Sequence, residues 1–282
     1  MQTHNINLNS KVEGHLFHLA IGNFDGIHLG HQQIINSLVK KAKESNRPSA
    51  ILSFNPHPRQ FFSRELDQYQ ILSEEKKQLI FTELGIDHYF CLKFDELLSN
   101  LSPVDFIKKI IVDQLKVEKL IVGYDFRFGK DRKGDTNLLL DHGKIHGFNL
   151  ETIEQITNPK TKTPYSSTDI RECIRTGEIE EANLLLGRPW SMQGKVIHGD
   201  KRARKMNFPT ANILPHNEIY PLKGVYAINI KFGDEVHKGI ANFGIRPTVE
   251  GEKLLLEAHL FDFDRDIYGN YLTVEFLAFI RG

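Results

Sequence analysis

Between residues 16 and 186, short apolar runs alternate with longer segments whose apolar residues recur at helical spacing. The short runs are rich in β-forming residues and are, in chain order, LFHLAIG, SAILSF, HYFCLKF and KLIVGYDF. Parallel strands need a crossover connection, usually a helix, so this alternation is typical of βαβ units. We therefore expect residues 1–186 to form an α/β domain with a Rossmann-like parallel sheet.

Two of the intervening helices carry further signals. In residues 31–43, five apolar side chains fall on one face of a helix: Ile34, Ile35, Leu38, Val39 and Ala42. In SPVDFIKKIIVDQL, Ser102 can cap a helix that begins with Pro103. The serine hydroxyl accepts a bond from an N–H of the first turn, and proline has no N–H to leave unpaired there.

The sequence changes character after EANLLLGRPW, near Arg188. From there the runs KVIHG, GVYAINIKF, KGIANFG, LLLEAHLFDF and LTVEFLAFI follow one another without a helical period. Short strands separated by turns favour an antiparallel barrel or sandwich, and we expect a second domain, an antiparallel β-barrel, over residues 187–282.

Composition limits the partners and the compartment. Lys and Arg together number 36, as do Asp and Glu, so the zero net charge favours no nucleic-acid partner. The two cysteines, Cys91 and Cys173, are far apart, which argues against a disulfide framework. The polar N-terminus and the lack of any apolar run near about 18 residues indicate neither export nor membrane insertion. We expect a cytoplasmic protein; nothing in the sequence indicates its oligomeric state.

The turn GNFDGIHLGH follows the first predicted strand, residues 16–21. In an open parallel sheet, ligands bind at the carboxyl ends of the strands. A glycine-rich turn that leads into a helix offers backbone N–H groups and a positive dipole end to a phosphate. His28 and His31 could add donors that stabilise charge on a phosphorus centre. On these residues alone, two solvated histidines or part of a metal site remain alternatives.

A second stretch, YSSTDIREC, has the residues of a phosphate-binding helix start. Ser167 can cap the helix, and Ser167 and Thr168 offer hydroxyls and N–H groups to a phosphate. Arg171 follows one helical turn later, and its guanidinium can donate two parallel hydrogen bonds to a phosphate. An ordinary helix cap explains the stretch alone equally well. By contrast, GKDRKGDT has the glycine spacing of a P-loop but places Asp135 where lysine is required, so we interpret it as a solvated loop.

These two stretches resemble the His-x-Gly-His and Ser-Ser-Thr-x-Ile-Arg signatures of the nucleotidyltransferases. With SFNPHPRQFF, VGYDFRFGKDRKGD and FPTANI, the sequence from about residue 17 to residue 281 is similar to the prokaryotic bifunctional riboflavin kinase/FMN adenylyltransferases. The resemblance implies two activities. The C-terminal domain would phosphorylate riboflavin to FMN with ATP, and the N-terminal domain would transfer AMP from ATP to FMN, forming FAD and pyrophosphate.

The resemblance also assigns roles to residues in the transfer of AMP to FMN. It implies catalytic roles for His28, His31 and Arg171. Phosphate contacts would come from Gly22, Phe24, Gly30, Ser167 and Thr168. Flavin contacts would come from Asn55, His57, Asp125, Phe126, Phe128 and, in the second domain, Arg246. Independently, the rings of Tyr124, Phe126 and Phe128 can offer a flat apolar surface, although strand core is the alternative. The Pro-His-Pro stretch could be only a rigid loop.

In the second domain the resemblance assigns Thr210 and Asn212 to Mg²⁺ and ATP, and Glu257 to the role of general base. A hydroxyl and an amide carbonyl are hard oxygen ligands that suit magnesium. A carboxylate can take the proton of the riboflavin 5′-hydroxyl as it attacks the γ-phosphorus. Taken alone, Thr210 and Asn212 could belong to an ordinary edge strand that begins after Pro209, and Glu257 could be a strand glutamate that faces solvent.

The chain departs from the family pattern in two respects. Ala203 and Asn207 stand where the family has glycines, so we expect a reshaped loop, because glycine most readily adopts positive φ beside phosphate. The C-terminal helix that usually packs on the barrel is expected to be absent. These departures leave open a monofunctional FMN adenylyltransferase with an impaired kinase. A non-catalytic flavin-binding regulator and an RNA-modifying enzyme are alternatives from other classes.

Overall fold

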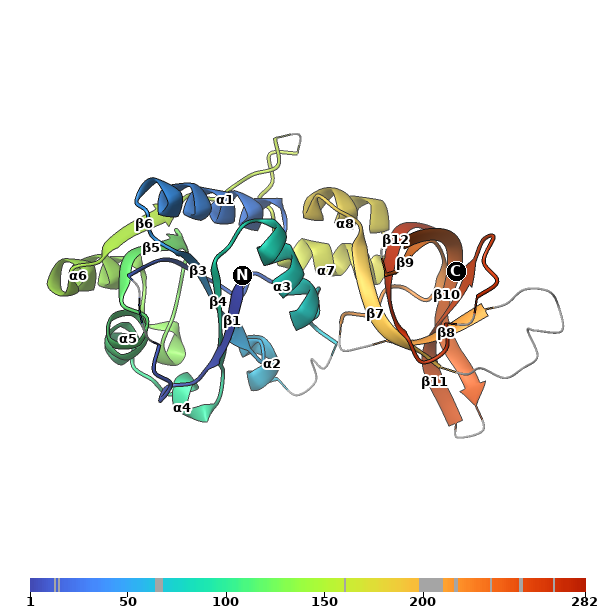
Figure 1. Ribbon diagram of the computed structural model, residues 1–282, viewed down its shortest axis with the longest axis horizontal. Helices are drawn as coiled ribbons and strands as arrows, with labels where there is room; N and C mark the ends of the chain where they lie inside the picture. Colours follow the sequence, from blue (N-terminus) through green and yellow to red (C-terminus); the bar gives the residue numbers. More distant parts are fainter. Residues whose placement is uncertain are drawn as a thin grey trace. The chain divides into compact units, whose positions relative to one another are not determined.

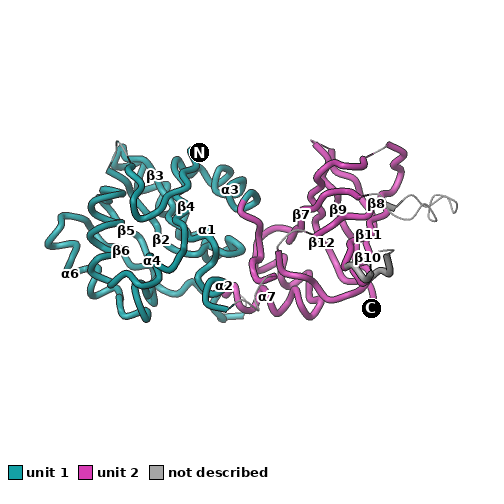
Figure 2. The backbone as a smooth tube through the Cα atoms, turned by 90° about the horizontal axis from the view of Figure 1, so that it is seen from below, with its two compact units in different colours: residues 1–67, 75–165 teal, residues 68–74, 166–282 magenta. Residues whose placement is uncertain are grey.

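The computed structural model describes residues 1–12, 14, 16–63, 68–159, 161–197, 210–215, 218–233, 235–248, 251–265 and 267–282. The chain forms two compact units, residues 1–67 with 75–165 and residues 68–74 with 166–282 (Figure 2). Residues 166–186 have their contacts mainly within the second unit and so belong to it. The functional division between residues 186 and 187 stays a prediction.

The first unit contains a six-stranded sheet whose neighbouring strands all pair in parallel, which confirms the expected α/β fold (Figure 1). Its spatial order is β1 (Gln2–Ile6), β4 (His88–Lys93), β3 (Ser49–Asn55), β2 (Phe17–Ile21), β5 (Val117–Gly123) and β6 (Asn149–Ile153). The chain proceeds from β2 outward to β4, then returns to place β5 on the other side of β2. This reversal makes the carboxyl ends of β2 and β5 a topological switch point, where such sheets bind ligands.

The helical segments of the first unit lie between these strands. They are α1 (Leu29–Glu44), α2 (Pro58–Phe62), α3 (Glu74–Glu83), α4 (Glu96–Ser99), α5 (Pro103–Phe106), the π-helix η1 (Ile107–Gln114), the 3₁₀ helix η2 (Lys130–Arg132) and α6 (Thr136–His146). The Ser102 hydroxyl caps α5 by accepting the N–H of Asp105 at 3.1 Å, as predicted. Within the described residues, no helix is long and apolar enough to cross a membrane.

Alternate residues of β2 pack on opposite faces of the sheet, because side chains alternate along a strand. Leu19 and Ile21 join an apolar cluster with Phe106, Ile110 and Ile111 from α5 and η1. The helix α1 contacts β2 and β3. Its buried apolar residues are Ile35, Leu38, Val39 and Ala42, and the fifth predicted residue, Ile34, is half-buried, so the predicted face is confirmed.

The sequence patterns missed both edge strands. In β1 only Ile6 is buried, and β6 has no fully buried residue, so neither strand presents an apolar run. The predicted strand over KLIVGYDF is also wrong at its end, because β5 stops at Gly123. Tyr124, Phe126 and Phe128 therefore lie beyond the strand and do not belong to it.

The second unit contains α7 (Ser167–Thr176), α8 (Ile179–Leu186) and a closed six-stranded barrel with antiparallel neighbours, as expected. The barrel order is β10 (Glu235–Thr248), β11 (Gly251–Leu260), β8 (Thr210–Pro215), β7 (Trp190–Ile197), β12 (Tyr271–Arg281) and β9 (Gly224–Phe232) (Figure 1). Large aromatic rings fill its interior, with Phe276 contacting Trp190 and Tyr226 at centroid distances of 4.7 and 5.1 Å.

Candidate active sites

The histidine turn joins the carboxyl end of β2 to α1, at the switch point of the sheet. Phe24, Gly26 and Ile27 all have positive φ angles, of 46°, 84° and 41°, which gives the turn a compact path. Positive φ is costly for non-glycine residues and gathers at functional sites. His28 is the N-cap of α1, and its Nδ1 accepts the backbone N–H of His31 at 3.2 Å.

The same turn stacks the two histidine rings, whose centroids lie 3.7 Å apart at an interplanar angle of 15°. His28 is buried, and Tyr165 lies beyond its ring at a centroid distance of 6.3 Å. Because Nδ1 of His28 is an acceptor, the neutral ring carries its proton on Nε2. The structure thus brings both predicted histidines together as one unit at the start of a helix.

Two glycines of the turn leave room for rings. A Cβ on Gly30 would stand 3.1 Å from Tyr165 Cβ and 3.2 Å from His28 Nδ1. A Cβ on Gly22 would stand 3.1 Å from the Phe24 ring. Phe24 itself is buried and packs edge-on against His31 at a centroid distance of 5.2 Å. Both glycines therefore let these rings pack directly against the backbone of the turn.

A cavity of about 1160 Å³ lies in the first unit and is lined by the predicted flavin residues Asp125, Phe126 and Phe128. The rings of Phe126 and Phe128 stack with centroids 5.6 Å apart. Gly22 and Asn23, at the end of β2, also line it, so the cavity reaches the histidine turn. An apolar cavity with a few polar groups is the usual form of a small-molecule site.

The sequence reasoning did not assign most of the aromatic wall of this cavity. The additional rings are Phe54, Phe61, Phe62, Phe94 and Phe106. Three of them stand in SFNPHPRQFF, a stretch recognised as a motif without roles for its phenylalanines. Side chains on the cavity also include Arg59, Arg127, Lys130 and Arg132.

Asn55 and His57 are not among the described residues that line this cavity. Asn55 is exposed, and its carbonyl accepts the backbone N–H of Phe94 at 2.9 Å. His57 is buried and caps α2, with Nδ1 accepting the N–H of Arg59 at 3.1 Å. In this structure His57 has a capping role at the start of a helix that borders the cavity.

The stretch GKDRKGDT, which has the glycine spacing of a P-loop, ends in a helix cap. Asp135 is the N-cap of α6, and its Oδ1 accepts the backbone N–H of Leu138 at 2.9 Å. A carboxylate at this helix start occupies the place that a phosphate would need. The interpretation that this glycine-rich stretch is no Walker site stays a prediction, which the cap supports.

In the second unit, the predicted cap of α7 is wrong by one residue. Ser166, with extended backbone, is the N-cap, and its Oγ accepts the N–H groups of Thr168 at 3.1 Å and Asp169 at 3.4 Å. Ser167 and Thr168 are instead the first two residues inside the helix. Adjacent serines cannot be told apart from sequence, because either hydroxyl can cap.

Arg171 is buried and held by the second unit itself. Its Nε donates to the carbonyl of Tyr69 at 3.0 Å, and Nη1 donates to the carbonyl of Ser167 at 3.1 Å. Its Cζ lies 3.8 Å from the centre of the Tyr69 ring. A planar guanidinium can stack on a ring and donate several hydrogen bonds at once, so these contacts favour arginine over lysine.

The barrel brings two of the predicted kinase residues together. Asn212 of β8 is the direct cross-strand partner of Glu257 of β11, and Thr210 is the partner of His259. Directly paired residues share a face of the sheet with Cβ atoms about 5 Å apart. Asn212 is 9% exposed and Glu257 is half-buried, so neither is a freely solvated strand residue.

Some of the predicted residues lie beyond what the structure describes. Thr210 and Arg246 belong to β8 and β10, but their side chains lie outside the described residues. Ala203 and Asn207, with the whole loop 198–209, also lie outside them. The effect of these two departures from the family pattern stays a prediction.

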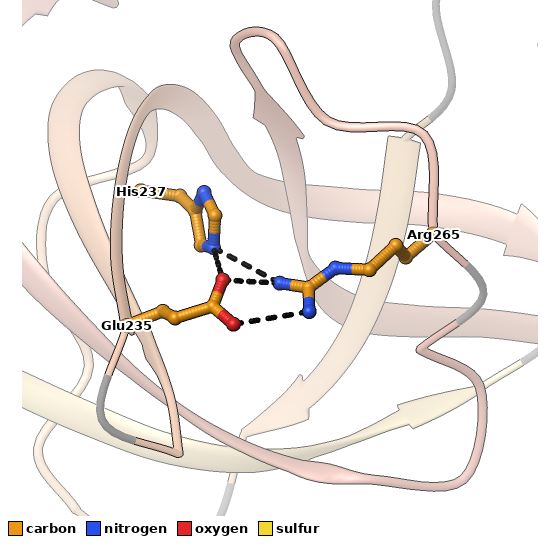
Figure 3. Close-up of polar contacts among 3 residues, drawn as sticks. All are labelled: Glu235, His237 and Arg265. Atoms are coloured by element: carbon orange, nitrogen blue, oxygen red, sulfur yellow. Dashed lines mark hydrogen bonds and ion pairs between the residues drawn. The ribbon is translucent and has the colours of Figure 1, made fainter.

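An exposed charged cluster on the barrel was not predicted (Figure 3). Arg265 donates from Nη1 to one carboxylate oxygen of Glu235 at 3.0 Å and from Nη2 to the other. His237 lies 2.9 Å from the same carboxylate, and the bond from Arg265 chiefly lowers the pKa of Glu235. The cluster joins the start of β10 to the segment between β11 and β12.

Two family models match consecutive parts of the chain: FAD synthetase over residues 12–169 and riboflavin kinase over residues 186–282. Curated relatives include the proteins called bifunctional riboflavin kinase/FMN adenylyltransferase from Haemophilus influenzae and Escherichia coli K12. The first is 39% identical over 93% of this chain and 85% of its own length. The second is 35% identical over 93% of this chain and 84% of its own length.

A solved structure also matches the chain. A crystal structure described as a macrolide-efflux protein from Streptococcus pneumoniae has a TM-score of 0.89 and 27% identity, and the match covers 100% of this chain and 91% of that one. Family models cover both halves, and relatives above one-third identity cover nearly the whole chain. This chain therefore belongs to the family of bifunctional riboflavin kinase/FMN adenylyltransferases, as the sequence motifs had indicated.

Proposed function

We propose that this protein makes FAD from riboflavin in two ATP-dependent steps. The barrel phosphorylates riboflavin to FMN and releases ADP, and the parallel-sheet domain adenylylates FMN to FAD and releases pyrophosphate. The observation that carries this proposal is that each unit has its own candidate site. One is the stacked histidine pair beside an aromatic cavity, and the other is the Asn212–Glu257 pair on the barrel.

In the adenylyl transfer, an FMN phosphate oxygen attacks the α-phosphorus of ATP and the bond to pyrophosphate breaks. We assign His28 and His31 to the phosphates, because ring N–H donors at a helix start stabilise the charge of the transition state. Gly22 and Gly30 let the backbone and rings approach closely. Ser167, Thr168 and Arg171 are assigned to the ATP phosphates by the family resemblance.

We assign the isoalloxazine ring of FMN to the aromatic cavity. Phe126 and Phe128 offer parallel faces on which a flat ring can stack, and the cavity is large enough for a flavin. Asp125, also on the cavity wall, can accept a bond from a flavin N–H or hydroxyl. Asn55 and His57 then act by shaping the loop that borders the cavity, and Arg246 stays a predicted flavin contact of the barrel.

In the kinase step, Glu257 takes the proton of the riboflavin 5′-hydroxyl while that oxygen forms a bond to the γ-phosphorus and the bond to ADP breaks. We assign Thr210 and Asn212 to a magnesium ion. The donor set fits, since the Asn212 amide oxygen is a hard ligand directly opposite a carboxylate. Magnesium, when bound with ATP, neutralises phosphate charge.

We expect small-molecule substrates only, with no nucleic-acid partner, since the chain has zero net charge. The use of ATP in both steps fits the cytoplasmic location expected from the sequence. The monofunctional alternative is not favoured, because the riboflavin kinase model matches residues 186–282.

Chromatography of the flavins formed from riboflavin or from FMN, each with Mg-ATP, tests the proposal. FAD from both substrates, with transient FMN from the first, is the expected result. FAD from FMN alone would establish the monofunctional alternative. No product from either would leave a flavin-binding protein without these activities.

A further inference from the structure

Glu257 stands between two asparagines. Its cross-strand partner on β8 is Asn212, and its partner on β10 is Asn242. Direct partners on adjacent strands lie on the same face with Cβ atoms about 5 Å apart. Three polar side chains from three strands thus form one row, with the carboxylate in the middle.

This row faces away from the barrel interior. The residues that flank Asn242 in β10, Ala241 and Phe243, are each 1% exposed, and those that flank Glu257, Leu256 and Ala258, are equally buried. Because side chains alternate along a strand, Asn242 and Glu257 lie on the opposite face. They are half-buried there.

Asn242 is an unusual residue for its position. Asparagine is depleted in strands, because its side chain competes with the ladder and packs poorly. Within the described part of the chain, its amide makes no side-chain hydrogen bond that would explain it. A half-buried amide with an unused donor and acceptor is ready to bind a polar group of a ligand.

The order of the strands indicates from which side the acceptor alcohol reaches Glu257. This step rests on the proposed kinase function. A general base must lie beside the hydroxyl that attacks, and the hydroxyl must be in line with the γ-phosphorus. The residues assigned to Mg-ATP, Thr210 and Asn212, are on β8, so the alcohol approaches Glu257 from the β10 side.

We propose that Asn242 binds the sugar-alcohol chain of the acceptor, at a hydroxyl next to the 5′-hydroxyl that Glu257 deprotonates. Its amide donates to or accepts from that hydroxyl and holds the chain so that the terminal oxygen faces the γ-phosphorus. Asn242 transfers no proton. It makes the barrel selective for a flavin whose side chain carries a hydroxyl next to the terminal alcohol over one that lacks it.

The test compares riboflavin with a synthetic 4′-deoxyriboflavin, which keeps the terminal hydroxyl and lacks only the hydroxyl next to it. Asn242→Val removes the amide and retains a strong strand former of similar size. The matched control is Asn229→Val, because Asn229 of β9 is also a half-buried strand asparagine directly opposite a glutamate, Glu275. Glu275 pairs with Lys231, outside the proposed site.

The measured quantity is kcat/KM for all phosphorylated flavin formed, FMN-type and FAD-type together. We expect the wild type and Asn229→Val to prefer riboflavin by about ten-fold, the usual size of one lost hydrogen bond. Asn242→Val should lose most of this preference by reacting more slowly with riboflavin alone. Asn242→Ser, which restores a short hydroxyl, should recover part of it.

Two results overturn the inference: Asn242→Val keeps the wild-type preference, or it slows both substrates equally, as a purely structural residue would. Thermal unfolding followed by the fluorescence of Trp190, the one tryptophan of the chain and a buried residue of the barrel, checks that the barrel of each variant is folded. Glu257→Gln tests the proposed kinase site separately. If that variant keeps the kinase rate, the kinase assignment fails; if it is inactive while the preference of Asn242→Val is unchanged, only the inference about Asn242 fails.

Discussion

Nδ1 of His28 accepts the backbone N–H of His31 at 3.2 Å, so the two histidines assigned to phosphate are tied together in the first turn of α1. His28 therefore has two separable roles. Its Nδ1 caps the helix, and its ring forms one side of the stacked pair. A substitution can keep the first role and remove the second.

We predict that His28→Asn keeps the fold and loses FAD formation. Asparagine is among the best N-caps, whereas His28→Ala should lose about 1 kcal/mol of the free energy of unfolding. Loss of one preorganised donor typically lowers kcat about 100-fold to 1000-fold. Thermal unfolding and FMN adenylylation should be measured for both variants. Near wild-type adenylylation by His28→Asn would show that the ring serves only as a cap.

The two activities should be separable by single substitutions. His31→Ala should abolish FAD formation from FMN and spare FMN formation from riboflavin, because His31 belongs to the parallel-sheet unit. Glu257→Ala should do the reverse, because Glu257 lies in the barrel. Both rates are measured on each variant by chromatography of the flavins. Loss of both activities in a folded variant would contradict the separation of the sites.

Arg171→Lys should destabilise the protein. The lysine cannot keep both hydrogen bonds to the carbonyls of Tyr69 and Ser167, nor the stacking on the Tyr69 ring. A lost hydrogen bond from a charged donor costs about 1.5–3 kcal/mol, which denaturant unfolding would detect. We also expect a higher KM for ATP in FAD formation. An unchanged KM for ATP, measured where the variant is folded, would mean that Arg171 serves structure alone.

Cys173 should resist thiol reagents in the folded protein. It is 8% exposed, and burial raises the pKa of its thiol from 9.0 to about 11. Near pH 8, only about one thiol in a thousand would then be ionised, and the thiolate is the reactive form. Alkylation mapped by mass spectrometry should label Cys173 in denaturant only. Equally fast labelling of the folded protein would contradict the prediction.

The same shift has a consequence for stability at high pH. The folded state favours the protonated thiol, so this contribution to the free energy of unfolding is fully present below pH 9.0 and is lost as the pH rises toward about 11. Cys173→Ala should lose less stability than the wild type over this range, which denaturant unfolding at several pH values would show.

Local signals in the sequence were sufficient for much of this fold. Alternating strands and helices predicted the parallel sheet, and a change in texture predicted the barrel. Caps are also local, and Ser102 was predicted at its helix start. Asp135 was judged unfit for a P-loop from its charge alone. Each of these features depends on residues within a few positions of one another, which is why the sequence carries them.

What the tertiary structure decided depends on segments that are distant in the chain. Arg171 bonds to the carbonyl of Tyr69, which is 102 residues away. The aromatic cavity gathers rings such as Phe62 and Phe94 from several loops, and Asn212, Glu257 and Asn242 meet because three strands pair in one register. Sequence alone predicted which residues carry the chemistry. Only the pairing of the strands in the sheet and the closure of the barrel decided which of them stand together, because register and packing are set by the whole fold.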